Sequence, residues 1–216
     1  MSPTLRHTTP TKQLTKLWIG VNVVGFAIAT PLSLLMTLTE DYLQALYMAG
    51  LIIGSIVGPL QAWVLKHQLP RLRTWQWTLA NIVGSYLGSW AGLFMVGSIA
   101  MMFRSFNSFT GLDGITALLL TLGIYGAVIG IFVGVAQIFS LPSQAQNVRQ
   151  WWTANFTGRS LGWLSAGLSG WFLSEAIPNL DEPFSLMLGA PLGAIGGAVY
   201  ALATAKAMLK LNSTSL

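Results

Sequence analysis

Six long apolar stretches restrict what this chain can fold into. Crossing about 30 Å of hydrocarbon takes roughly 20 residues, and a spanning segment must be helical because lipid offers no partner for an open backbone N–H or C=O. The sequence therefore predicts an all-α integral membrane protein with six transmembrane helices. The predicted spans are residues 17–38, 42–65, 75–102, 115–141, 151–174 and 185–209, within a single transmembrane domain (1–216) that starts with a cytoplasmic tail (1–16).

The distribution of charge supports this count and orients the helices. Only 8% of the residues are charged, against about 25% in ordinary globular proteins. With six crossings, ten of the eleven Lys and Arg residues lie on or near the side that holds both termini, and all six acids face the other side. Because basic loops stay on the cytoplasmic side, we expect both termini to be cytoplasmic.

The start of the chain has a competing interpretation. Two lysines, an apolar run and Ala27-Ile28-Ala29 resemble a signal peptide with its cleavage site. The apolar run continues past Pro31 to Leu38, however, which is long enough to span a membrane. We therefore expect a retained first helix.

Two spacing patterns each occur three times and predict three tandem helical hairpins. Spacings of three and four residues place each set on one helical face, and all copies run in the same direction, so the predicted repeat is parallel. The even-numbered spans read G-x3-G-x3-G-x2-[QY]: Gly50, Gly54, Gly58, Gln61; Gly126, Gly130, Gly134, Gln137; and Gly189, Gly193, Gly197, Tyr200. The odd-numbered spans read W-x3-N-x2-G-x3-[GA]: Trp18, Asn22, Gly25, Ala29; Trp77, Asn81, Gly84, Gly88; and Trp151, Asn155, Gly158, Gly162.

The glycine faces predict close helix packing, because small residues let two backbones approach in lipid. We expect these faces to join helices of this chain, since neighbouring repeats need one another to bury such surfaces. The alternative is that one face holds a partner subunit.

A polar cluster is predicted about one turn inside the cytoplasmic boundary. Amides in hydrocarbon seek partners, and a hydrogen bond between helices contributes about 0.6–2 kcal/mol. We expect such bonds between neighbouring helices; the alternative is a ring of amides that lines a polar solute site. The cluster consists of Asn22, Asn81, Asn155, Gln61, Gln137 and Tyr200.

Arg159 is the candidate binding residue. Its equivalents in the other two copies are Phe26 and Ser85, so the hairpin fold does not demand a cation there. Ionisable residues inside a membrane are functional candidates, and a guanidinium can bind a lipid phosphate or a solute carboxylate. The alternative is that Arg159 snorkels to the cytoplasmic surface.

The predicted cytoplasmic border carries basic and aromatic residues. Lys66, Arg71 and Arg73 share one turn, where we expect them to attract anionic lipid headgroups. Tryptophans at the same border are interpreted as interface anchors: Trp75, Trp77, Trp151 and Trp152.

The sequence does not contain the residues that most catalytic sites use. The chain has no cysteine, and its two histidines, His7 and His67, lie outside the predicted membrane interior. No acid lies deep in a span, and no phosphate-binding loop or nucleophile elbow is present. Eleven basic residues are also too few for a nucleic-acid-binding face. We expect no enzyme activity and predict no catalytic, cofactor or metal site.

One segment carries a family resemblance. Gly54-x3-Gly58-x2-Gln61-Ala62-Trp63-Val64-Leu65-Lys66, followed by Trp77 and Gly84-x3-Gly88, resembles uncharacterised Gly-rich bacterial multi-span membrane proteins with repeated Q-W-L-V-L-[KR] and W-x3-N-x2-G hairpins. The similarity covers the second to fifth spans, and the first and sixth more weakly. After Gln137 the basic end of the motif is missing. The resemblance implies a plasma or internal bacterial membrane and no particular activity.

Two functions remain open from the sequence. The favoured one is a non-enzymatic packing, assembly or interaction subunit, with another membrane protein as its partner. The alternative is a binding or transport pathway for a small solute or lipid at the repeat interface. A continuous polar cavity that reaches Arg159 would favour the second, whereas asparagines that face other helices, with no cavity beyond a few waters, would favour the first.

Overall fold

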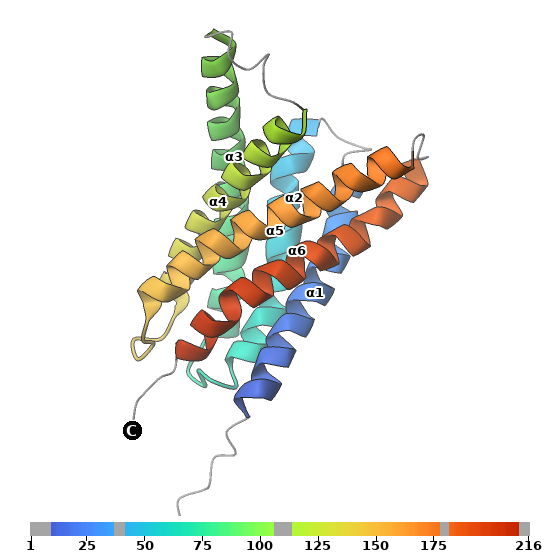
Figure 1. Cartoon of the computed structure of the whole chain (residues 1–216). Helices are drawn as coiled ribbons and strands as arrows, with labels where there is room; N and C mark the ends of the chain where they lie inside the picture. The colour runs from blue at the N-terminus through green and yellow to red at the C-terminus, as the bar shows by residue number, and fades with distance from the viewer. Residues whose placement is uncertain (1–9, 37–41, 106–113, 178–181, 212–216) are drawn as a thin grey trace, which may run out of the picture.

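Within the residues that it describes, the computed structural model consists of six α-helices that run alternately in opposite directions (Figure 1). It describes residues 10–36, 42–105, 114–177 and 182–211. We call the end of the bundle at which the first helix begins and the last helix ends the proximal end, and the opposite end the distal end (Figure 1). The helices are α1 (Thr11–Met36), α2 (Tyr42–Leu65), α3 (Thr74–Ser105), α4 (Gly114–Ser140), α5 (Val148–Ala176) and α6 (Glu182–Lys210).

Five of these helices are long and apolar enough to cross a membrane, by length and composition within the described residues. They are α1, α2, α3, α4 and α6. The exception, α5, is 29 residues long and contains Asn155 and Arg159, which lower its apolar character. The all-helical fold with multiple candidate spans agrees with the prediction.

The first helix begins earlier than its predicted span. It starts at Thr11 rather than at residue 17, so residues 11–16 of the predicted tail are helical, while 1–9 lie outside the described residues. The N–H groups of Gln13 and Leu14 donate to the carbonyl oxygen of Pro10 at 2.9 and 3.1 Å, and Leu14 is buried. Packing of this extra turn therefore extends α1 beyond its apolar run.

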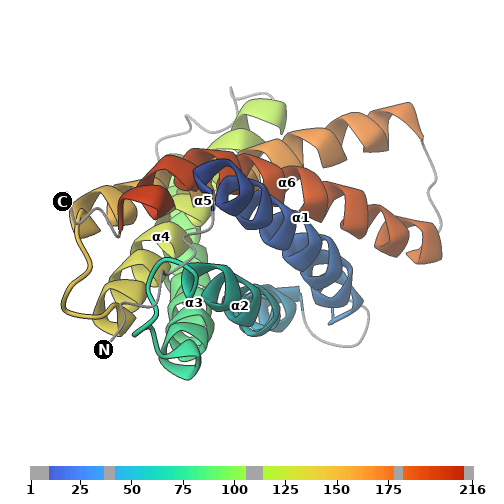
Figure 2. The same cartoon turned by 90° about the horizontal axis from the view of Figure 1, so that it is seen from below.

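Each helix packs against its neighbours in the sequence, and α6 also packs against α1. Figure 2 shows α1 lying between α2 and α6. The six helices thus form a closed arrangement in which the first and last helices are adjacent.

The glycine faces of the even-numbered helices lie against the odd-numbered helix that follows. A methyl group at Gly54 would lie 2.6 Å from the carbonyl oxygen of Asn81, and one at Gly130 would lie 2.6 Å from that of Asn155. The α6 face meets α1, where a methyl group at Gly197 would lie 2.6 Å from the carbonyl oxygen of Asn22. These helix backbones are therefore too close to admit even an alanine without moving.

Candidate functional site

Three tryptophans fill the centre of the bundle toward the proximal end. Trp18, Trp77 and Trp151 come from α1, α3 and α5, and each is 0% exposed. The ring centroids of Trp18 and Trp77 each lie 5.8 Å from that of Trp151. The prediction that Trp77 and Trp151 anchor the interface is therefore wrong, because large rings at one depth on inward-facing helix faces pack together; Trp75, in contrast, is exposed.

The predicted polar cluster forms pairs between adjacent helices. Each asparagine accepts a hydrogen bond at its side-chain oxygen and uses its amide N–H to bond the carbonyl of the tryptophan four residues earlier. All six side chains are buried. The donors are Gln61 Nε2 to Asn22 (2.8 Å), Gln137 Nε2 to Asn81 (3.1 Å) and Tyr200 Oη to Asn155 (2.8 Å).

The tryptophan N–H groups extend this network unevenly. Trp151 Nε1 donates to Gln137 Oε1 at 3.0 Å, linking α5 to α4. The matching atoms on α3 and α2, Trp77 Nε1 and Gln61 Oε1, are buried without a hydrogen-bond partner. Polar groups in this region therefore serve mainly helix–helix contacts, with one pair left unsatisfied.

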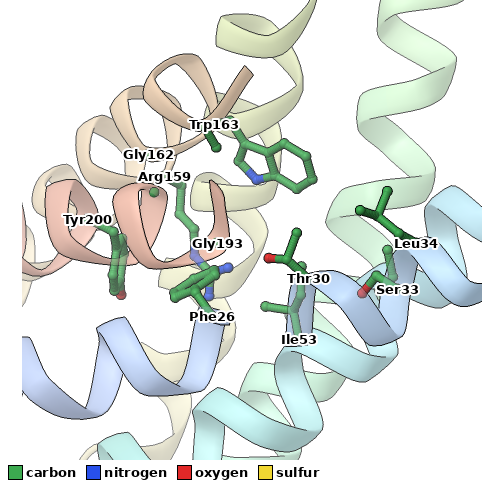
Figure 3. Close-up of a pocket in the computed structure, with 13 residues that line it drawn as sticks. Phe26, Thr30, Ser33, Leu34, Ile53, Arg159, Gly162, Trp163, Gly193 and Tyr200 are labelled. Atoms are coloured by element: carbon green, nitrogen blue, oxygen red, sulfur yellow. The ribbon is translucent and has the colours of Figure 1, made fainter. Parts of the chain in front are cut away.

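Arg159 lies inside the bundle. Its side chain projects from α5 toward α1 and α6 (Figure 3), and only 2% of the residue is exposed. The guanidinium carbon lies over the rings of Phe26 and Tyr200, 5.4 and 5.1 Å from their centroids. The position of the cation is thus set by two aromatic faces, and the burial weighs against snorkelling.

Two guanidinium nitrogens of Arg159 lack hydrogen bonds. Nε and Nη2 are both buried without a partner, and no carboxylate among the described residues pairs with the side chain. A buried donor left unpaired costs about 1–3 kcal/mol, and more when it is charged, whereas a cation–π contact returns about 0.5–2 kcal/mol. The aromatic contacts therefore only partly compensate the burial of this charge.

A cavity of about 140 Å³ opens beside Arg159, and we call it the Arg159 pocket. It is lined by residues of α1, α2, α5 and α6 and extends distally along α1 from Phe26 to Leu34, which is about 12 Å of helix. Thr30 and Trp163 face it in Figure 3. Apart from Arg159, its walls consist mostly of apolar and small side chains.

The Arg159 pocket lies where the α6–α1 contact departs from the other glycine contacts. Gly130 of α4 packs on Asn155, but Gly193, which matches Gly130 in the sequence pattern, faces Phe26 instead; Gly197 meets Asn22, the match of Asn155. α6 is therefore displaced along α1 by four residues (Gly193 to Gly197), about 6 Å. The displaced face supplies Gly193 to the pocket wall.

From the sequence, Arg159 and Tyr200 were predicted as site residues and Gly162 and Gly193 were placed in packing faces, but the rest of the pocket wall was missed. Gly196 lies beside the repeated glycine stripe, and a methyl group there would lie 3.0 Å from the carbonyl oxygen of Gly162. The glycine doublet Gly196-Gly197 was the available signal. Of the predicted polar cluster, only Tyr200 lines the pocket.

The basic turn between α2 and α3 presents its charges outward. Leu69 and Leu72 are 4% and 2% exposed and anchor the turn in the core. The side chains between and beside them are exposed: Lys66, Arg71 and Arg73. The turn therefore places all three cations where solvent or lipid headgroups can reach them. Their contact with anionic headgroups stays a prediction.

The described part of the chain contains no group of three or more His, Asp or Glu side chains that could hold a metal ion. The fold and composition together define a multi-pass helical membrane protein. Comparison with protein-family models, curated proteins and solved structures yields no match for the chain.

Proposed function

We propose that this chain is a bacterial membrane protein, of the plasma or an internal membrane, built from three parallel hairpins with both termini in the cytoplasm. The polar pairs support the hairpins, because each joins two consecutive helices: α1 to α2, α3 to α4, and α5 to α6. The glycine faces support the repeat, because those of α2 and α4 pack on the odd-numbered helix that follows and that of α6 packs on α1. The distribution of basic residues supports the orientation.

We further propose that α5 is the sixth span. Its 29 residues correspond to about 44 Å of helix, more than the hydrocarbon thickness requires. Asn155 and Arg159 are 0% and 2% exposed, so these polar groups face the bundle and not the lipid. Because the polar side chains of α5 face inward, its low apolar content is compatible with a helix that spans the membrane.

The Arg159 pocket, we propose, binds a molecule that combines negative charge with an apolar body. The observation that carries this function is the buried guanidinium of Arg159, which has no carboxylate partner among the described residues, in the wall of a cavity. Arg159 lies ten residues beyond Arg149, about 15 Å of helix and thus about half of the hydrocarbon thickness. A ligand anion would supply the missing counter-charge at that depth.

Binding is favoured over an open channel. The packed rings of Trp18, Trp77 and Trp151 occupy the bundle centre on the proximal side of the pocket. The network that surrounds them carries hydrogen bonds between helices and not a polar passage. The proposed role is therefore ligand binding without catalysis.

The packing or assembly role favoured by the sequence stays a prediction. The glycine faces that could have received a partner are covered by α1, α3 and α5 of the same chain. A membrane protein partner would then have to use another surface. Anionic lipid headgroups at Lys66, Arg71 and Arg73 remain the proposed contact at the cytoplasmic border.

The two roles can be separated by purification. The wild-type chain and Arg159→Leu are purified from their native membrane in mild detergent, and co-purifying molecules are identified by mass spectrometry. A stoichiometric anionic amphiphile on the wild type that is lost from Arg159→Leu supports the binding role. A stoichiometric protein partner on both, with no bound anion, supports assembly and contradicts the binding role.

A further inference from the structure

The indole N–H of Trp163 is a hydrogen-bond donor in the wall of the Arg159 pocket. Trp163 is a partly buried residue of α5 that lines the cavity, and Figure 3 shows its nitrogen on the cavity side of the ring. Among the described residues Nε1 has no hydrogen-bond partner. Nε and Nη2 of Arg159 are sealed from the cavity, but Trp163 Nε1 is not. Trp163 is therefore a donor that a molecule in the cavity can contact.

Other buried tryptophans of the bundle use their N–H groups in helix contacts. Trp18 Nε1 donates to Thr204 and Trp151 Nε1 to Gln137, both at 3.0 Å. Trp163 lies four residues beyond Arg159 on α5, one turn further into the proposed span. At that depth its N–H is away from the membrane interface, where tryptophans usually find a polar partner. An unpaired N–H in such a place is unfavourable, and a ligand acceptor would remove the cost.

We infer that the Arg159 pocket holds an uncharged, mainly apolar group that carries a carbonyl, with the carbonyl oxygen accepting a hydrogen bond from Trp163 Nε1. This inference rests on the proposed binding role and names the part of the ligand that lies inside the cavity. Because Nε and Nη2 of Arg159 are sealed, the negative charge proposed for the ligand acts on the guanidinium through space and without contact.

The hydroxyl of Thr30 explains why a carbonyl suits the cavity. Thr30 faces the same space from α1 (Figure 3), and its side chain makes no hydrogen bond among the described residues. The hydroxyls of Ser33 and Tyr200, in contrast, already donate within the bundle. A carbonyl oxygen has two lone pairs and can accept from an indole N–H and a hydroxyl together. It brings no donor of its own, so no polar group of the ligand is left unpaired.

The remaining walls and the size of the pocket limit the rest of the group. Ala49, Ile53 and Ala166 offer contact to hydrocarbon, and a strongly polar group would lose hydrogen bonds to water without replacing them. The volume of about 140 Å³ is close to that of a cavity of about 150 Å³ known to hold one benzene molecule. The cavity therefore suits one ring or a short chain segment with its carbonyl.

Equilibrium binding of radiolabelled acetophenone tests this inference. The full-length protein is placed in nanodiscs of zwitterionic phosphatidylcholine, and uptake by empty nanodiscs is subtracted. Radiolabelled α-methylstyrene, in which a CH₂ group replaces the carbonyl oxygen, is the apolar probe of matched shape. We expect saturable binding of one acetophenone per chain. Its affinity should be about three- to ten-fold higher than that of α-methylstyrene, once each is expressed relative to the probe dissolved in the bilayer.

A variant tests the indole N–H itself. Trp163→Phe removes the N–H and keeps an aromatic ring beside Tyr125, whose ring centroid lies 4.9 Å from that of Trp163. We expect acetophenone affinity to fall about three- to ten-fold and α-methylstyrene affinity to change less than about two-fold. Trp171→Phe is the matched control, because it makes the same change on α5 outside the cavity, and should bind both probes as the wild type does. Far-UV circular dichroism and monodisperse elution verify that each variant is folded.

The outcomes keep this inference apart from the proposed function. Equal affinity of the wild type for the two probes, or unchanged acetophenone affinity in folded Trp163→Phe, would overturn the carbonyl inference. Absence of saturable acetophenone binding by the folded wild type would overturn it as well. None of these results decides the binding role itself, which the co-purification of an anionic amphiphile with the wild type and not with Arg159→Leu tests separately. The comparison of the two probes uses the wild type alone, so it decides the inference even where Trp163→Phe fails to fold.

Discussion

The guanidinium carbon of Arg159 lies 5.1 Å from the ring centroid of Tyr200, and the hydroxyl of the same tyrosine donates a 2.8 Å hydrogen bond to Asn155. Tyr200 therefore links the buried cation of the pocket to the polar pair that joins α5 and α6. Its ring and its hydroxyl make different contacts, so substitution can separate pocket formation from helix pairing.

Tyr200→Phe removes the hydroxyl and keeps the ring beside Arg159. We expect stability to fall by about 1 kcal/mol, because one hydrogen bond between membrane helices is lost, while retention of a co-purifying anionic amphiphile stays close to that of the wild type. Tyr200→Ala removes both contacts and should weaken binding as well. Thermal unfolding in detergent and mass spectrometry of the co-purifying ligand measure the two effects. Loss of binding in folded Tyr200→Phe would assign the hydroxyl to the ligand site.

The glycine contacts predict a position-specific response to alanine. At Gly130 a methyl group would meet the carbonyl oxygen of Asn155 at 2.6 Å and the Cα of Phe156 at 2.8 Å, both backbone atoms. We expect Gly130→Ala to destabilise the protein by about 1–3 kcal/mol, because the helices must move apart. Gly97→Ala is the control, since nothing lies within 4 Å of its added carbon. Equal thermal midpoints for the two variants would contradict this packing of α4 on α5.

Two tryptophans of the central cluster allow a matched comparison of substitutions. Trp77→Phe and Trp151→Phe remove similar volume from fully buried positions, but only Trp151 donates a hydrogen bond, to Gln137. We expect Trp151→Phe to cost about 1 kcal/mol more than Trp77→Phe, the value of one buried hydrogen bond. Unfolding titrations of both variants give the difference. A larger loss for Trp77→Phe would mean that its N–H has a partner that the network does not include.

Much of the fold could be predicted because the repeated residue spacings show which residues share one face of a helix. Spacings of three and four residues identified Gly130 and Asn155 as members of inward faces, and the structure places them against each other. The same patterns contain no information on how far one helix slides along another. The displacement that brings Gly193 to Phe26 instead of Asn22 depends on the packing of all side chains between α6 and α1.

Of the candidate site, only Arg159 and Tyr200 were predicted as site residues. Arg159 broke the repeat, since its equivalents are Phe26 and Ser85, and that departure identified it. The pocket wall came from residues with ordinary membrane-helix character, such as Ile53 and Ala166, for which composition gives no signal. Trp151 was misassigned to the interface because a tryptophan near a predicted boundary has the same sequence signature whether it faces lipid or the bundle.

Arg159→Leu provides the clearest test of what the buried cation contributes. If Arg159 serves a ligand, then in ligand-free protein it is a buried charge without a counter-ion, and its replacement by an apolar side chain should raise stability by about 1 kcal/mol or more. If Arg159 instead holds α1, α5 and α6 together through Phe26 and Tyr200, the same change should lower stability by about 1–4 kcal/mol, the value of two cation–π contacts. Thermal unfolding of delipidated protein in an uncharged detergent separates the two cases, with Arg149→Leu as the exposed control. A rise in stability together with loss of the co-purifying anionic amphiphile identifies a residue kept for its ligand at a cost to the fold. A fall in stability would make Arg159 a structural cation and leave the pocket without its anion partner.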